Sequence, residues 1–136
     1  METIKTLVVD DTIVYRKIVG DVLKEVPGVE VAGTANNGKI ALSKIKTLKP
    51  DLITLDIEMP EVSGIEVLES LRNDPNAPVV IMLSTLTQQG SEMTIRALEL
   101  GAFDFIAKPS EGKMAENIEK VKAALLPILQ TVKRQK

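Results

Sequence analysis

The chain has 136 residues, 44% hydrophobic and 26% charged, a composition typical of one globular domain rather than of a disordered or collagen-like segment. It contains no cysteine and no histidine, which excludes disulfides, thiol catalysis, imidazole bases and every metal site built on these residues. The net charge of −2 and the near absence of aromatic residues argue against direct binding to nucleic acid. The chemistry left to the chain is that of carboxylates, hydroxyls and lysine.

The sequence gives no sign of a membrane segment or of an export signal. The longest apolar run without proline is Val79 to Leu83, far below the ~18 residues of a membrane span. The N-terminus turns acidic at Asp10 and Asp11, where a signal peptide needs its hydrophobic stretch. We therefore expect a cytoplasmic protein without membrane contact.

Short β-rich runs alternate with amphipathic stretches five times along the chain. The runs predict strands at Ile4–Val9, Val29–Ala35, Leu52–Leu55 continuing into Asp56, Val79–Leu83 and Phe103–Ala107. Apolar residues at helical spacing predict helices around 15–26, 41–48, 65–71, 95–98 and 114–132. Because the strands are almost continuously apolar, the alternation favours an α/β fold, a doubly wound (βα)5 sandwich around a parallel five-stranded sheet.

Two helical segments carry specific expectations. In the fourth helix, Ile95 and Leu98 are expected to face the core. In the last helix, Pro127 removes a backbone hydrogen bond, which predicts a kink or an end at that point. We accordingly expect one domain over residues 1–126, followed over residues 127–136 by the end of the helix and a frayed polar tail.

Polar residues follow four of the five predicted strands: Asp10 and Asp11, then Asp56, then Ser84 and Thr85, then Lys108 and Pro109. Folds of this kind bind ligands outside the carboxyl ends of their strands. Three clustered carboxylates repel one another unless a cation lies between them, and oxygen ligands alone favour Mg²⁺, with Mn²⁺ as a second option. The ammonium and hydroxyl groups suit a phosphoryl group beside the metal, which makes Asp56, on the central strand, the candidate nucleophile.

Each of these residues also has an ordinary structural interpretation. Asp10, Asp11 and Thr12 suit the start of the first helix, and Asp56 suits a turn. Ser84 and Thr85 suit the start of the fourth helix, and a lysine–proline pair is a common turn. Their joint occurrence at one edge of a sheet favours the functional interpretation.

Four features together resemble the bacterial response-regulator receiver domain: LVVDD at residues 7–11, LITLDIEMP at 52–60, the hydroxyl of Ser84, and FDFIAKP at 103–109. The match extends over about residues 4–126 in the order and spacing of the family. The resemblance implies a flavodoxin-like fold in which Asp56 accepts a phosphoryl group. It also implies that Asp11, Asp56 and the backbone carbonyl of Glu58 hold Mg²⁺, and that Asp10 acts on the metal through water.

The resemblance further implies a conformational switch. Lys108 would contact the phosphoryl group, Ser84 would reorient on phosphorylation, and Phe105 would be the aromatic switch residue. The peptide bond between Lys108 and Pro109 is expected to be cis. The face formed by the fourth helix, the fifth strand and the fifth helix would then change, and its residues expected to meet a partner are Gln88, Gln89, Glu92, Met93 and Arg96. Met93 suits the core equally well.

Segments at 58–60, 84–90, 99–105 and 108–110 are similar to the receivers of chemotaxis protein-glutamate methylesterases. This similarity implies a chemotaxis-type sensor histidine kinase as phosphodonor, with a downstream protein or a methylesterase catalytic domain as output. Because a methylesterase needs a catalytic histidine, the chain is expected to catalyse only its own phosphorylation and dephosphorylation. It is interpreted either as a stand-alone receiver or as the regulatory domain excised from a methylesterase.

Three other classes of protein share part of this sequence pattern. A haloacid-dehalogenase-type phosphatase needs Asp-x-Asp after the first strand, but Thr12 stands at the second position. A mononucleotide binder needs a phosphate loop there, and a pair of aspartates would repel phosphate. A vestigial receiver that serves only as a protein-interaction module keeps the same fold, and it stays open as the structural alternative.

Overall fold

The computed structural model describes residues 3–59, 61–85, 88–109 and 113–135. Its elements, in chain order, are β1 (Ile4–Val9), α1 (Ile13–Lys24), β2 (Val29–Ala35), α2 (Gly38–Leu48), β3 (Leu52–Asp56), α3 (Gly64–Leu71), β4 (Val79–Ser84), α4 (Gln88–Glu99), β5 (Asp104–Ala107) and α5 (Met114–Gln135). The strands pair in parallel in the order β2-β1-β3-β4-β5. This arrangement confirms the predicted doubly wound α/β sandwich.

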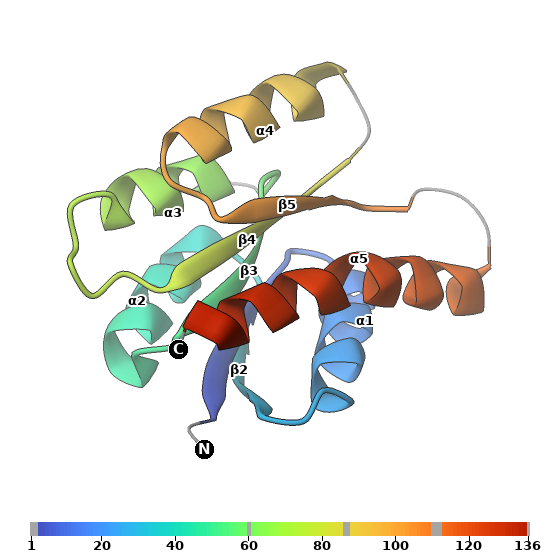
Figure 1. Ribbon diagram of the computed structural model, residues 1–136. Helices are drawn as coiled ribbons and strands as arrows, with labels where there is room; N and C mark the ends of the chain where they lie inside the picture. The colour runs from blue at the N-terminus through green and yellow to red at the C-terminus, as the bar shows by residue number, and fades with distance from the viewer. Residues whose placement is uncertain (1–2, 60, 86–87, 110–112, 136) are drawn as a thin grey trace.

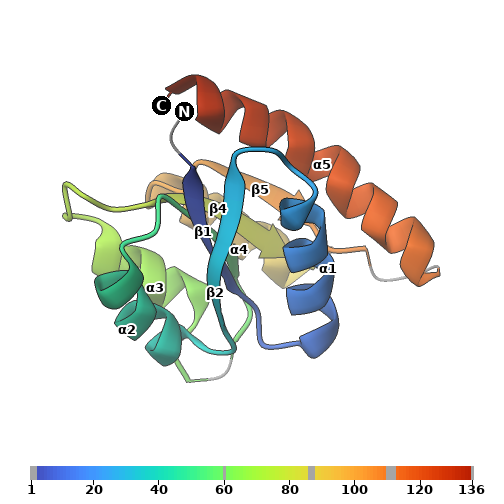
Figure 2. The same ribbon diagram turned by 90° about the horizontal axis from the view of Figure 1, so that it is seen from below.

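Two helical layers cover the sheet. Helices α1 and α5 lie on one face, and α2, α3 and α4 lie on the other (Figures 1 and 2). Because successive side chains of a strand point to opposite faces, the strands contribute to both of the apolar clusters that result. The sheet is therefore buried on both faces, as its continuous apolar strands predict.

The same alternation decides where the polar strand-end residues point. Side chains an even number of residues apart along a strand point to the same face. Asp10, Asp56 and Lys108 have such a spacing from apolar residues of β1, β3 and β5, respectively, that pack under α1 and α5. Ser84 instead continues the row of β4 that packs under the opposite helical layer. The three charged residues are thus directed to one side of the sheet edge and the hydroxyl of Ser84 to the other.

Three helices begin at polar residues that cap them. The side chains of Thr12, Asn37 and Ser63 accept hydrogen bonds from the backbone N–H groups three residues ahead, at the starts of α1, α2 and α3. Such caps satisfy N–H groups that have no partner within the helix. Ser84 is the last residue of β4, and the described part of helix α4 begins at Gln88.

The expectation that Ile95 and Leu98 face the core is wrong. Their side chains are 59% and 41% exposed, while Ala97 of the same helix and Leu100, the residue after its end, are buried. Both pairs have a spacing of three residues, so the apolar period alone does not tell which of two apolar stripes faces inward. Ala97 and Leu100 pack against the sheet, and Ile95 and Leu98 border a surface cavity.

Helix α5 does not end at Pro127, and the residues after it, expected to be frayed, are helical up to Gln135. Leu125 and Leu129, on either side of the proline, are fully buried, and Val132 continues the stripe. Burial of this stripe offsets the backbone hydrogen bond that the proline removes. No helix in the described part of the chain is both long and apolar enough to cross a membrane.

Two helical glycines make a matched test of this packing. A Cβ atom at Gly64, the first residue of α3, would lie 2.3 Å from the backbone oxygen of Asp56, whereas a Cβ at Gly20 in α1 would meet no heavy atom within 4 Å. We expect Gly64→Ala to lower the free energy of unfolding by about 1–3 kcal/mol through backbone displacement. We expect Gly20→Ala to raise it by about 0.5–1 kcal/mol, because alanine favours a helix. Urea unfolding followed by circular dichroism measures both changes, and equal stabilities for the two variants would contradict the packing described.

Candidate phosphorylation site

Three carboxylates meet at the carboxyl edge of the sheet. Asp10 and Asp11 follow β1, Asp56 ends β3, and one oxygen from each lies within 4.8 Å of the others. Asp10 and Asp56 are each only 2% exposed, whereas Asp11 is open to solvent. The sequence prediction that these residues gather is confirmed, because β1 and β3 are neighbours in the sheet.

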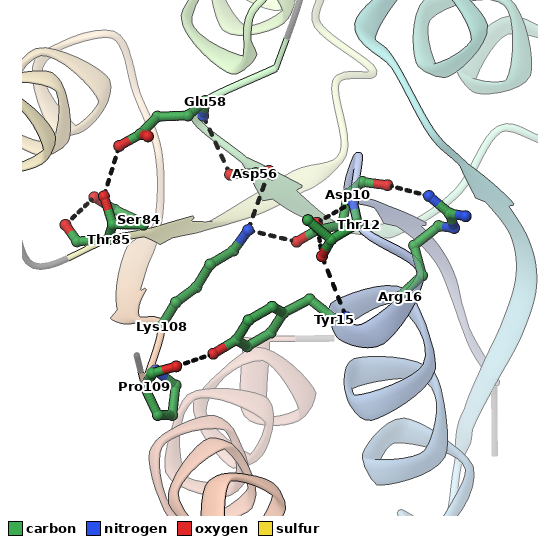
Figure 3. Close-up of polar contacts among 10 residues, drawn as sticks. All are labelled: Asp10, Thr12, Tyr15, Arg16, Asp56, Glu58, Ser84, Thr85, Lys108 and Pro109. Atoms are coloured by element: carbon green, nitrogen blue, oxygen red, sulfur yellow. Dashed lines mark hydrogen bonds and ion pairs between the residues drawn. The ribbon is translucent and has the colours of Figure 1, made fainter. Parts of the chain in front are cut away.

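Lys108 reaches the same place from the end of β5. Its ammonium nitrogen lies 2.8 Å from Oδ2 of Asp10 and 3.1 Å from Oδ2 of Asp56 (Figure 3). Burial alone would lower the pKa of Lys108, but its hydrogen bond to Asp10 and the charges of Asp56 and Asp10 together raise it. The lysine therefore stays protonated and neutralises part of the buried negative charge.

The same surroundings favour the neutral form of Asp56. Burial, opposed by the positive charge of Lys108 and supported by Asp10, raises the pKa of its carboxyl from 3.8 to about 7. In the absence of a metal ion, Asp56 thus holds a proton more tightly than an ordinary aspartate does. A divalent cation among the three carboxylates would favour the ionised form.

Backbone and side-chain hydrogen bonds fix the two buried carboxylates. Oδ1 of Asp10 accepts from the N–H and the hydroxyl of Thr12, both at 2.9 Å, and the guanidinium of Arg16 donates to the Asp10 carbonyl at 2.7 Å. Oδ1 of Asp56 accepts from the N–H of Glu58 at 3.1 Å. The structural interpretation of these aspartates is therefore also correct in part, since Asp10 orders the turn that leads into α1.

The donor set fits a hard cation. The three clustered ligand atoms are carboxylate oxygens, the sequence has no cysteine or histidine, and the exposure of Asp11 leaves one side open to water and substrate. Mg²⁺ binds in this way, through a few carboxylates and several waters, and Mn²⁺ accepts the same ligands.

The expected switch residues border a common cavity on the other side of this edge. Ser84 is buried, and its hydroxyl donates to the Thr85 carbonyl at 3.1 Å. Phe105, 44% exposed, lies across a cavity of about 230 Å³ lined by Ser84, Thr85, Ser91, Thr94, Ile95, Leu98, Phe105 and Ala107. The structure therefore places the hydroxyl and the aromatic ring next to the same space.

A side-chain hydrogen bond joins the loops that follow β3 and β4. The hydroxyl of Thr85 donates to Oε1 of Glu58 at 2.7 Å (Figure 3). From the sequence, only the backbone of Glu58 is expected in the site. No sequence pattern indicates this side-chain contact, since the two residues are 27 positions apart.

Tyr15 is a further residue of the site, and it is not among the residues expected there from the sequence. Its side chain packs against the apolar cluster under α1 and α5, as helical spacing indicates, and in addition its ring centroid lies 4.8 Å from the Lys108 ammonium and its hydroxyl donates to the Pro109 carbonyl. Its place in the first turn after Asp10 and Asp11, as the sole tyrosine of the chain, was the available signal.

The structure also bears on the expected cis peptide bond and on the expected partner-binding residues of α4. The bond between Lys108 and Pro109 was expected to be cis, but no cis peptide occurs in the described residues, and trans is the intrinsically favoured form. On α4, Glu92 and Arg96 are exposed, and Met93 is half-buried and packs against the core. The side chains of Gln88 and Gln89 lie outside the described part of the chain.

The chain is similar in sequence to part of several larger proteins. The protein-glutamate methylesterase/protein-glutamine glutaminase of Desulfotalea psychrophila is 60% identical over 131 residues, which are 96% of this chain and 36% of that protein. The protein of the same name from Bacillus subtilis is 50% identical over 123 residues, 90% of this chain and 34% of its own length. The chain thus spans about a third of the length of these curated relatives.

Solved structures of response regulators are similar to this chain over its whole fold. The response regulator domain of Thermotoga maritima CheB matches with a TM-score of 0.81 and 38% identity, over 98% of this chain and 96% of that one. The structure of the P1 domain of CheA3 in complex with CheY6 from R. sphaeroides matches with a TM-score of 0.76 and 31% identity, over 98% and 99% of the two chains. The family model for the response regulator receiver domain matches residues 6–120, which contain all three carboxylates and Lys108. The chain therefore belongs to the response regulator receiver domain family.

Proposed function

We propose that the chain is the phosphoacceptor domain of a chemotaxis response regulator, with Asp56 as the residue that is phosphorylated. The observation that carries this proposal is the buried contact of Lys108 with both Asp10 and Asp56, at 2.8 and 3.1 Å. A buried lysine between carboxylates is costly to maintain for stability alone. It is useful where a phosphoryl group has to be bound beside a metal ion.

The residues that would hold the metal are Asp11, Asp56 and the backbone carbonyl of Glu58, with Asp10 acting through water. When bound, Mg²⁺ or Mn²⁺ would offset the charge of the carboxylates and of the incoming phosphoryl group. The 4.8 Å cluster of carboxylate oxygens supports this assignment for the three aspartates.

A carboxylate oxygen of Asp56 attacks phosphorus, the bond from phosphorus to the donor breaks, and the electron pair leaves with the donor. Lys108 transfers one of its hydrogen bonds to a phosphoryl oxygen. Ser84 turns from the Thr85 carbonyl toward the phosphoryl group, and Phe105 moves into the cavity that it borders. Phosphorylation thereby shifts the population of the α4–β5–α5 face between two states.

Two similarities support the partners we propose. A neighbouring structure contains the P1 domain of CheA3 with CheY6, which supports a chemotaxis-type sensor histidine kinase as phosphodonor. The curated relatives are methylesterases, which supports a methylesterase catalytic domain, or a separate downstream protein, as the output. With these partners, the proposed location of the chain is the cytoplasm. The rival assignment is a vestigial receiver that only binds proteins.

Intact mass after incubation with acetyl phosphate tests the phosphoacceptor role. We expect one phosphoryl adduct in the presence of Mg²⁺, and none with EDTA or in Asp56→Asn, because the metal and the nucleophile are both required. Asp21→Asn removes an exposed carboxylate that pairs with Lys17, and it should form the adduct like the wild type. Absence of the adduct from the wild type with both acetyl phosphate and a phosphorylated kinase would favour the vestigial receiver.

The raised pKa of Asp56 also predicts how the free energy of unfolding depends on pH in the absence of metal. Because folding raises its pKa from 3.8 to about 7, its contribution to stability is fully present below about pH 4 and is lost as the pH rises through 7. In EDTA, the free energy of unfolding should fall over this range by on the order of 2 kcal/mol more in the wild type than in Asp56→Asn.

Mg²⁺ should reverse this loss at about pH 8 and have little effect at about pH 5, because it binds the ionised carboxylate. Urea unfolding at the two pH values, with and without the metal, measures both effects. Parallel pH profiles for the wild type and Asp56→Asn would show that Asp56 titrates normally.

A further inference from the structure

Tyr15 connects the start of α1 to the segment that follows β5. Its backbone N–H donates to the hydroxyl of Thr12, the cap of α1, which anchors the residue beside Asp10 and Asp11. Its side chain then extends across the edge of the sheet to Lys108 and Pro109 (Figure 3). The tyrosine therefore bridges the two chain segments that supply the carboxylates and the lysine of the site.

Both the ring and the hydroxyl of Tyr15 make polar interactions. The ring centroid lies 4.8 Å from the ammonium of Lys108, within the range of a cation–π interaction. The hydroxyl donates to the carbonyl of Pro109, the residue directly after the lysine. Burial raises the pKa of the Tyr15 hydroxyl, Lys108 opposes the rise and Asp10 adds to it, so the group stays protonated and able to donate at neutral pH.

The ring and the carboxylates together limit where the ammonium can go. Oδ2 of Asp10 and Oδ2 of Asp56 hold the Lys108 nitrogen at 2.8 and 3.1 Å, while the aromatic ring lies against it and needs no hydrogen bond in return. When a phosphoryl group arrives at Asp56, the ammonium has to give up one of these carboxylates for a phosphoryl oxygen. The ring keeps it desolvated and close to its partners during that exchange.

We propose that Tyr15 is a positioning residue for phosphoryl transfer, which holds the Lys108 ammonium through its ring and the backbone after that lysine through its hydroxyl. This inference rests on the proposed phosphoacceptor function. Tyr15, a residue of α1, would thus position the ammonium during the reaction, which neither the carboxylates nor the lysine can do alone.

The rate of adduct formation tests the inference. With acetyl phosphate at saturating Mg²⁺, we expect Tyr15→Leu to slow the reaction by about 3- to 30-fold, the effect of losing a desolvated cation–π contact. Tyr15→Phe keeps the ring and should retain at least about half of the wild-type rate. Phe103→Leu removes a ring from the same apolar layer at the opposite end of β5 and should leave the rate unchanged. Thermal unfolding of each variant verifies that the folded protein is being compared.

A second readout does not depend on turnover. Tyr15 is the sole tyrosine and the chain has no tryptophan, so tyrosine emission reports on this side chain alone. Beryllofluoride with Mg²⁺, an analogue of the bound phosphoryl group, should change this emission in the wild type and change it less in Lys108→Met, which removes the charge from the ring.

The outcomes separate the two proposals. An adduct in the wild type that forms equally fast in folded Tyr15→Leu would overturn the positioning role and leave the phosphoacceptor function intact. Emission that responds equally in the wild type and in Lys108→Met would overturn the contact between ring and ammonium. A wild type that forms no adduct with any phosphodonor would remove both proposals together.

Discussion

The charge balance of the site depends on one buried ammonium group. Lys108 pairs with Asp10 and Asp56, two carboxylates that are almost completely removed from water. Without the lysine, their mutual repulsion and desolvation would oppose folding of the sheet edge. With it, they form a site that is still short of positive charge, because three carboxylates face one ammonium. That remaining imbalance would favour a divalent cation, and the charge of such a cation would in turn offset that of a phosphoryl group.

The sequence was sufficient for the fold and for the charged part of the site. Parallel strands bring their carboxyl ends to one edge, so Asp10, Asp56 and Lys108 could be placed together from strand boundaries alone. It was not sufficient where an outcome depends on competing contacts. A spacing of three residues in and just after α4 is satisfied by Ile95 and Leu98 as well as by Ala97 and Leu100, and only packing against the sheet selects the second pair.

The missed features have the same physical origin. Tyr15 reads as a core residue because its helical spacing is that of a core residue, and its contact with Lys108 joins residues that are 93 positions apart in the chain, from 15 to 108. The bond between Thr85 and Glu58 likewise depends on how two loops lie relative to each other. The continuation of α5 past Pro127 depends on the burial of Leu129, which a local rule for proline does not include. Local patterns predict elements and their ends, whereas these contacts are decided by tertiary structure.

The position of β5 at the edge of the sheet has a consequence for the order of folding. Asp10 and Asp56 belong to the inner strands β1 and β3, but their counter-charge comes from the last strand, on the far side of β4. A partly folded chain with β1 and β3 paired and β5 detached would bury two carboxylates without compensation. Such intermediates are therefore disfavoured electrostatically, which couples the last strand to the first and makes unfolding more cooperative than apolar packing alone would.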